Sequence, residues 1–261
     1  MIARATDTYA CVVTTGDRMR GVVGVIGEVL ITAGLVVGLF AVYTLFWTGV
    51  ETANQQDALE EQFEALSSGD VQGPAGPDAA EQDTPEPEEN DEAPVAERQP
   101  LPGDAFARMR IPRLGESWSW IVVSGVDLGS LTAGPGHYPD SASPGEIGNF
   151  AVAGHRATYG EPFAYLDTLQ VGDEIFVERG GREYRYLVTE SFITVPSDTG
   201  VLLPVPGQPG IVADEASLTL TTCHPRWGST ERLIVHGELA GSTKVPSAQN
   251  QASGVGEEAV A

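Results

Sequence analysis

Two short stretches, Ser217-Leu-Thr-Leu-Thr-Thr-Cys223 and Arg232-Leu-Ile-Val-His-Gly-Glu-Leu239, decide the fold of this chain. In the first, leucines alternate with small polar residues, which is the period-two pattern of a strand with one face in a core. The loop between the two stretches is short enough to fold the second back as a neighbouring antiparallel strand. We therefore expect Cys223 and Arg232 to lie level on adjacent strands.

The region around these stretches, from about Leu101, has the texture of a β domain. Short runs of Val, Ile, Phe, Thr and Tyr are broken by Gly and Pro, which is typical of an antiparallel barrel or sandwich. About 160 residues suffice for a hydrophobic core. We predict a short helix over Pro162–Leu169 and strands near 106–111, 119–124, 149–155, 174–179, 183–195, 217–223 and 232–239.

A long apolar segment lies near the start of the chain. Residues Val29–Val50 carry no charge, and as a helix they would extend roughly 33 Å, enough to cross a bilayer core of about 30 Å. A cleaved signal peptide is the alternative, but its apolar core is shorter. Arg4, Arg18 and Arg20 precede the segment and no basic residue follows it before Arg98. This asymmetry predicts a single-pass cell-membrane protein with a cytoplasmic N-terminus and an extracellular remainder.

The negative charge of the chain is concentrated just beyond this segment. The 261 residues include 14 Lys and Arg against 37 Asp and Glu, a formal net charge of −23. Fifteen of the acidic residues and one basic residue lie in 51–100. The excess of acidic groups excludes a nucleic-acid-binding function, which needs a surplus of basic groups.

The acidic region divides into two parts. Leu59, Phe63 and Leu66 have helical spacing, which predicts that the membrane helix continues over 51–66. Residues 67–100 are dominated by Gly, Pro, Ala and acids, which is typical of a disordered linker. We expect the repulsion of this linker from anionic membrane and wall polymers to hold the folded domain outward, and an acidic recognition segment is the alternative.

Cys223 is a candidate nucleophile. The other cysteine, Cys11, lies on the predicted cytoplasmic side, so the two cannot form a disulfide. An unpaired extracellular thiol is an oxidation liability unless its reactivity is used, although a small buried hydrophobe at a strand end is the alternative. The break at His224-Pro225 places the thiol at a strand terminus beside a loop.

A thiol nucleophile needs a base, and His155 has the most suitable position. It ends an apolar run at a strand terminus facing a loop, although a structural hydrogen-bonding role stays open. His224 would point to the opposite face from Cys223. His236 is four residues from Arg232, about 13 Å along a strand. His137 lies in a Gly- and Pro-rich turn region, where a structural polar role is expected.

Arg232 is the candidate cation beside the thiol. A guanidinium stays charged at physiological pH and can donate hydrogen bonds to an oxyanion. A surface salt bridge is the alternative role. The chain has no Cys-x-x-Cys, no His-Glu-x-x-His and no calcium-loop pattern, so we expect neither a metal nor another cofactor.

Together these segments resemble the active-site motifs of sortases. The resemblance rests on Thr219-Leu-Thr-Thr-Cys223, on Arg232 nine residues later and on Gly148-Asn-Phe-Ala-Val-Ala-Gly-His155-Arg. More narrowly, Ala153-Gly-His-Arg-Ala-Thr-Tyr-Gly160 and Gly27-Glu-Val-Leu-Ile-Thr-Ala-Gly34 resemble class E sortases of actinobacteria. The resemblance covers the anchor and about 103–240, and it implies a mostly β fold built on an eight-stranded sortase-type β-barrel with short helices.

The resemblance also implies roles for individual residues. It makes Cys223 the nucleophile, His155 the general acid and base, and Arg232 the stabiliser of the oxyanion or substrate. It places a substrate-contacting tyrosine at Tyr138, and Thr221 and Thr222 flank the thiol as in the motif. For these three, packing of a rim aromatic and filling of a strand are the alternatives.

The implied activity is that of a membrane-anchored cysteine transpeptidase. Such an enzyme cleaves a C-terminal sorting signal similar to Leu-Pro-x-Thr-Gly, or Leu-Ala-x-Thr-Gly for class E, between Thr and Gly through a thioacyl intermediate. The implied partners are surface proteins bearing that signal and an acceptor amine from a lipid II-type peptidoglycan precursor or from a pilin lysine. A pilin-polymerising sortase, an extracellular cysteine peptidase and a non-catalytic β-barrel surface module stay as alternatives.

These observations predict five regions along the chain. They are a cytoplasmic tail over 1–24, a transmembrane signal anchor over 25–50, an acidic Pro- and Glu-rich extracellular linker over 51–102, a sortase catalytic domain over 103–240 and a flexible tail over 241–261.

Overall fold

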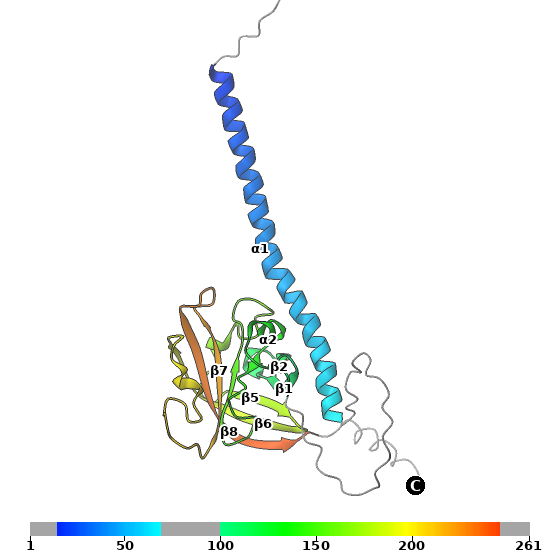
Figure 1. Cartoon of the computed structure of the whole chain (residues 1–261), viewed down its shortest axis with the longest axis vertical. Helices are drawn as coiled ribbons and strands as arrows, with labels where there is room; N and C mark the ends of the chain where they lie inside the picture. The colour runs from blue at the N-terminus through cyan, green and yellow to red at the C-terminus, as the bar shows by residue number, and fades with distance from the viewer. Residues whose placement is uncertain (1–14, 69–99, 246–261) are drawn as a thin grey trace, which may run out of the picture. The chain divides into compact units, whose positions relative to one another are not determined.

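The computed structural model describes residues 15–68 and 100–245 of the chain (Figure 1). By internal contacts the chain divides into two units, residues 1–47 and residues 48–261. Helix α1, Thr15–Ser68, crosses this boundary, so its last part belongs to the second unit. Most of the predicted acidic linker and of the C-terminal tail lies outside the described residues.

The described part of the first unit is the apolar portion of α1. Its large apolar side chains are exposed, including Leu30, Ile31 and Val37, each of which is more than 60 % accessible. The helix is long and apolar enough to span a membrane. The predicted extension of the helix beyond Val50 is confirmed, because α1 continues without a break to Ser68.

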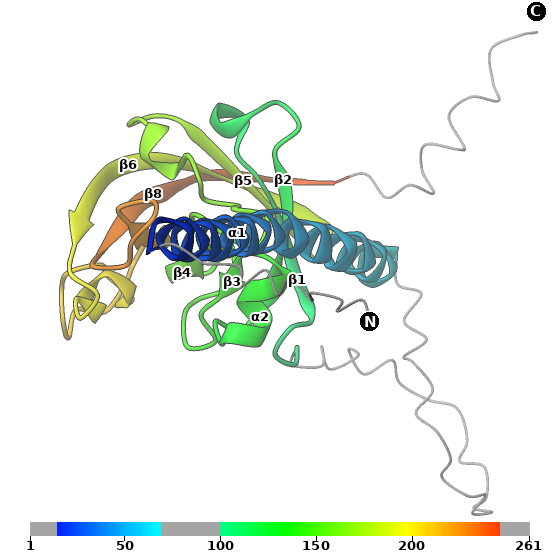
Figure 2. The same ribbon diagram turned by 90° about the horizontal axis from the view of Figure 1, so that it is seen from above.

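Within residues 100–245, eight strands form a closed barrel in the order β1-β2-β3-β4-β7-β8-β6-β5, which confirms the predicted eight-stranded, mostly β fold. The strands are β1 (Ala105–Arg110), β2 (Ser119–Ser124), β3 (Gly136–His137), β4 (Gly148–Ala153), β5 (Glu174–Arg179), β6 (Arg182–Thr194), β7 (Ala216–His224) and β8 (Glu231–Lys244). The long strands β6 and β8 run side by side in Figure 2, as their antiparallel register requires.

The structure corrects three details of the sequence prediction. Instead of a helix over Pro162–Leu169 there is a single 3-10 turn, η2 (Leu166–Thr168), because its backbone bonds join residues three apart, as in Thr168 N to Tyr165 O. Helix α2 (Leu128–Ala133), capped by the side chain of Asp127, was not predicted. Strand β3 was not predicted either. The remaining short helical turns are η1 (Pro112–Leu114) and η3 (Thr199–Leu202).

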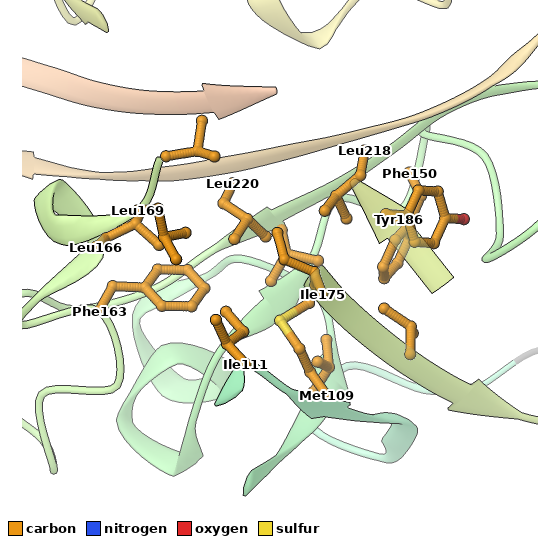
Figure 3. Close-up of a cluster of buried hydrophobic side chains, with 14 of the residues drawn as sticks. Met109, Ile111, Phe150, Phe163, Leu166, Leu169, Ile175, Tyr186, Leu218 and Leu220 are labelled. Carbon is orange, nitrogen blue, oxygen red and sulfur yellow. The ribbon is translucent and has the colours of Figure 1, made fainter. Parts of the chain in front are cut away.

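Side chains at alternate positions along the strands are buried in the core of the barrel. Leu218 and Leu220 of β7 are fully buried, as are Phe150 of β4 and Val235 of β8. Figure 3 shows the β7 leucines in one cluster with Phe150, Tyr186, Met109 and Ile175. Because side chains alternate across a strand, Thr219, Thr221 and Cys223 lie on the other face of β7.

Candidate active site

Three neighbouring strands end or begin at the same edge of the barrel. Strands β7 and β8 are antiparallel, with Cys223 paired to Arg232, so the predicted level placement of these two residues is confirmed. Strands β4 and β7 are parallel, with Ala153 paired to Thr221. The pairing ends there, and His155 follows Ala153 by two residues, as Cys223 follows Thr221. Cys223 and Arg232 therefore lie side by side on β7 and β8, and His155 lies just beyond the end of the neighbouring strand β4.

Hydrogen bonds beyond the end of β4 fix the backbone around His155. The amide of Gly154 donates to Thr221 O at 3.1 Å, and the hydroxyl of Thr222 donates to Gly154 O at 2.7 Å. On the other side, the amide of Phe163 donates to His155 O at 3.0 Å. A Cβ at position 154 would lie 2.5 Å from the Phe163 ring, so only glycine permits this close packing. The backbone on both sides of His155 is thus fixed to β7 and to the following loop.

The His155 ring is half-buried and packs against one aromatic side chain. The ring of Tyr159 lies 4.9 Å away between centroids at an angle of 37°. Burial lowers the pKa of His155 below its ordinary value because it disfavours the charged imidazolium. The neutral ring, which can act as a base, is therefore favoured more than in an exposed histidine.

Arg232 is partly buried and held by the loop that joins β7 to β8. Its Nη1 donates to Ser229 O at 3.1 Å and to Glu231 O at 2.9 Å. Among the described residues no carboxylate forms an ion pair with this guanidinium, so the surface salt bridge considered for it is not found there. Nη2 and Nε have no acceptor within the described part of the chain, and these donors can serve a ligand beside Cys223.

The three predicted substrate-contacting residues lie next to this edge. Tyr138 follows β3, and its hydroxyl lies 3.2 Å from Thr221 Oγ1, two residues before the thiol. Its backbone amide is bonded to Ala151 O of β4 at 3.0 Å. Thr222 is buried with its hydroxyl directed to Gly154 O. Tyr138 and Thr221 therefore present polar groups on the Cys223 face, whereas the Thr222 hydroxyl joins β7 to β4.

A buried arginine beside His155 was not predicted from the sequence. The side chain of Arg156 is 4 % exposed, and its Nη2 pairs with Asp167 Oδ2 at 2.8 Å. Its Nη1 donates to His224 Nδ1 at 2.7 Å. A guanidinium can only donate, so Nδ1 of His224 is an acceptor and the ring proton is on Nε2. This bond joins the residue after His155 to the residue after Cys223.

A second bridge joins the loops that follow β4 and β7. Arg226 Nη2 pairs with Glu161 Oε2 at 2.5 Å, and its guanidinium lies over the rings of Tyr165 and Trp227. The sequence signal for both bridges is a single arginine within three residues of the end of β4 and of β7, but their burial depends on the packing of distant loops.

The other histidines have structural surroundings. His137 is buried between Phe106 and Phe150, and its Nε2 lies 3.1 Å from Ala142 O. This agrees with the structural role expected for it. His236 is buried against Thr219, four residues before Cys223, with Nδ1 2.9 Å from the hydroxyl.

Comparison with known proteins identifies the family of this arrangement. A family model described as the sortase domain matches residues 109–240, which contain all three candidate catalytic residues. The chain belongs to the sortase family. Members of this family are cysteine transpeptidases, and the predicted resemblance to class E is confirmed by its relatives.

Two curated sortases from Streptomyces coelicolor illustrate the relationship. Sortase SrtE1 is 34 % identical over 226 residues, covering 82 % of this chain and 56 % of its own length. Sortase SrtE2 is 32 % identical over 234 residues, covering 85 % of this chain and 84 % of its own length. The chain thus spans little more than half the length of SrtE1.

Solved structures of class E sortases share the barrel. Sortase E from Streptomyces avermitilis is 42 % identical with a TM-score of 0.51, and the match covers 55 % of this chain and 93 % of that one. Sortase E1 from Streptomyces coelicolor, solved with a tripeptide in the active site, is 36 % identical with a TM-score of 0.51. That match covers 56 % of this chain and 94 % of the other.

Proposed function

We propose that this chain is a membrane-anchored sortase that cleaves a C-terminal sorting signal between Thr and Gly and transfers the protein to an amine. The observation that supports the proposal is the pairing of Cys223 with Arg232, beside the end of β4, which His155 follows by two residues. The tripeptide in the active site of the related sortase E1 supports a peptide substrate. The signal resembles Leu-Pro-x-Thr-Gly or, as expected for class E, Leu-Ala-x-Thr-Gly.

The first half of the reaction forms a thioacyl intermediate. The thiolate of Cys223 attacks the carbonyl carbon of the signal threonine, and the carbonyl oxygen becomes an oxyanion. Arg232 donates hydrogen bonds to that oxygen from Nη2 and Nε, the two nitrogens that have no acceptor within the described residues. The C–N bond then breaks, and the imidazolium of His155 gives its proton to the leaving glycine amine.

The second half returns the enzyme to its starting state. An acceptor amine attacks the thioacyl carbonyl, His155 takes the proton from the attacking nitrogen, and the thiolate of Cys223 leaves. The lowered pKa of His155 suits the second half, in which the ring is a base. It also reduces the imidazolium fraction that can protonate the leaving amine in the first half at neutral pH.

The remaining parts of the proposal concern substrate contacts and location. Tyr138, Thr221 and Thr222 contact the signal peptide or shape its groove. The apolar helix crosses the cell membrane once, with the N-terminus in the cytoplasm and the barrel outside. The acceptor amine belongs to a lipid II-type peptidoglycan precursor. A pilin lysine is the less favoured acceptor because the region before the barrel has no Asp-Pro-aromatic lid motif.

The test uses the full-length chain in detergent micelles with a sorting-signal peptide, with and without triglycine. We expect an amine-dependent ligated product and a thioacyl adduct whose mass maps to Cys223. Cys223→Ala should abolish both, whereas Cys11→Ser, which removes the other thiol, should leave both unchanged. Hydrolysis without a ligated product would instead identify a cysteine peptidase. No reaction of the sorting-signal peptide, with or without triglycine, would point to a non-catalytic barrel.

A further inference from the structure

The last part of α1, residues 48–68, forms specific hydrogen bonds with the barrel. Gln56 Nε2 donates to Ile121 O at 3.0 Å and to Ala133 O at 2.8 Å, and its Oε1 accepts from Ile121 N at 2.8 Å. Thr52 is fully buried and donates to Thr132 O at 2.8 Å. One glutamine thus satisfies backbone groups of both β2 and α2.

Apolar and charged contacts continue along the same face of the helix. Leu59 and Phe63 are buried in a cluster with Ile121. The guanidinium of Arg108 in β1 lies over the Phe63 ring at 4.8 Å and pairs with Glu60. Buried apolar contacts and paired charges of this kind are found inside domains, not along linkers.

The same helix contacts the loop that follows His155. A Cβ at Gly160 would lie 2.5 Å from the Trp120 ring and 3.3 Å from Thr52 Cγ2. The preceding residue, Tyr159, packs its ring on His155 at 4.9 Å. A chain of direct neighbours therefore runs from Thr52 through residues 160 and 159 to the proposed acid and base.

The backbone of this loop needs such support. Tyr159, Gly160 and Glu161 have φ values of 53°, 71° and 52°, so two residues other than glycine adopt the left-handed region. Such conformations persist where surrounding contacts hold them. One side of the loop is held by Trp120 and Thr52, and the other by the ion pair of Glu161 with Arg226.

We propose that residues 48–68 are a working part of the catalytic domain, and that Thr52 and Gln56 are positioning residues for the loop that follows His155. The catalytic role of His155 rests on the function proposed above, whereas the docking does not. The domain then begins near Thr48, more than fifty residues before the predicted boundary at 103.

This docking bears on how residues 69–99, the acidic segment between α1 and β1, connect the parts of the protein. Gln62 Oε1 accepts from Ala105 N at 3.1 Å, so the helix is bonded to the start of β1 on the far side of that segment. Both flanks of residues 69–99 therefore belong to one unit. The segment is an insertion between two docked elements, and its length does not set the separation of helix and barrel.

The docking is tested by hydrogen–deuterium exchange on the full-length chain in detergent micelles. Gln56→Ala should speed amide exchange at least tenfold over 50–66 and over 156–163, with β7 still protected. Gln55→Ala is the matched control and should change neither region more than twofold, because within the described residues the Gln55 side chain bonds only to Glu51 of its own helix. Thr52→Val, which keeps the side-chain shape, is the milder second variant if the barrel of Gln56→Ala does not fold.

Turnover of a sorting-signal peptide tests the positioning role. Gln56→Ala should lower kcat at least fivefold with KM within twofold, since the substrate groove is intact and the His155 loop is not. Unchanged exchange over 156–163 in both Gln56→Ala and Thr52→Val would overturn the proposal. A wild-type chain without any turnover contradicts the proposed function instead, and the exchange results still decide the docking.

A deletion tests the place of the acidic segment. Removing residues 76–91 leaves about 15 residues, which reach roughly 50 Å when extended. We expect exchange over 50–66 and kcat to stay within twofold of the full-length chain. Release of the helix, or loss of turnover, would show that the segment length matters and would overturn this part of the proposal.

Discussion

Removal of the buried Arg156 side chain tests whether its guanidinium holds together the loops that follow β4 and β7 beside the candidate active site. Arg156, the residue after His155, bonds to His224, the residue after Cys223, at 2.7 Å. It also pairs with Asp167 at 2.8 Å. Arg156→Ala deletes both bonds and leaves the loops after β4 and β7 without this connection. We expect lower stability together with slower turnover.

The magnitude follows from the surroundings of the guanidinium. Each hydrogen bond to a charged group contributes about 1.5–3 kcal/mol. Against this, Nε is buried without an acceptor among the described residues, so its removal relieves about 1–3 kcal/mol. Asp167 is 51 % exposed and is solvated when its partner leaves. With central values of about 4.5 kcal/mol lost and about 2 kcal/mol relieved, the net loss is about 2–3 kcal/mol, or roughly 4–12 °C in Tm for a domain of this size.

The assay is thermal unfolding of the full-length chain in detergent, followed by peptide turnover below the transition. Arg185→Ala is the matched control, since the pair of Arg185 with Glu174 at 2.9 Å is 47 % and 42 % exposed and should contribute less than about 1 kcal/mol. Arg156→Lys should lose about half as much as Arg156→Ala, because one ammonium cannot reach both partners. Equal Tm values for Arg156→Ala and Arg185→Ala would refute the reasoning.

Three further predictions address the proposed roles. Arg232→Lys should slow turnover by about tenfold or more, because an ammonium lacks the planar fork of donors, and near-normal rates would remove Arg232 from the mechanism. Tyr138→Phe removes the bond to Thr221 and should raise KM severalfold at nearly constant Tm; an unchanged KM would argue for packing alone. Burial lowers the pKa of His137 to about 4, so below pH 6.5 the unfolded chain binds more protons and stability falls as the pH drops toward 4, by on the order of 3 kcal/mol. Urea unfolding at pH 7 and pH 4.5 measures this loss, and His137→Asn should reduce it; the same loss in both proteins would contradict the assignment.

The strands were predictable where side chains alternate over several residues. The predicted bounds 119–124 and 174–179 match β2 and β5, and the other five long strands differ by a few residues at their ends. Strand β3 has only Gly136 and His137, too few residues for a pattern, and it exists because β2 and β4 lie on either side of it. The mistaken helix over 162–169 has the proline of a helix start, but its backbone closes tighter turns.

The candidate site was predictable as far as strand ends allow. Alternation and a short loop were enough to place Cys223 level with Arg232, whereas the choice of His155 at the end of an apolar run stays a prediction. The bridge of Arg156 to His224 was not predicted, because an arginine is ordinarily expected at the surface. Gln56 was not recognised either, since its partners are backbone groups far away in the chain.

The sequence by itself determined the apolar helix, the alternating strands and the residue types of a thiol transpeptidase site. These depend on the local periods of helix and strand and on the chemistry of single side chains. Only the tertiary structure decided that residues 48–68 dock on the barrel and that the loop after His155 is held from both sides. Those features arise from hydrogen bonds and packing between segments distant in sequence, which no local pattern records.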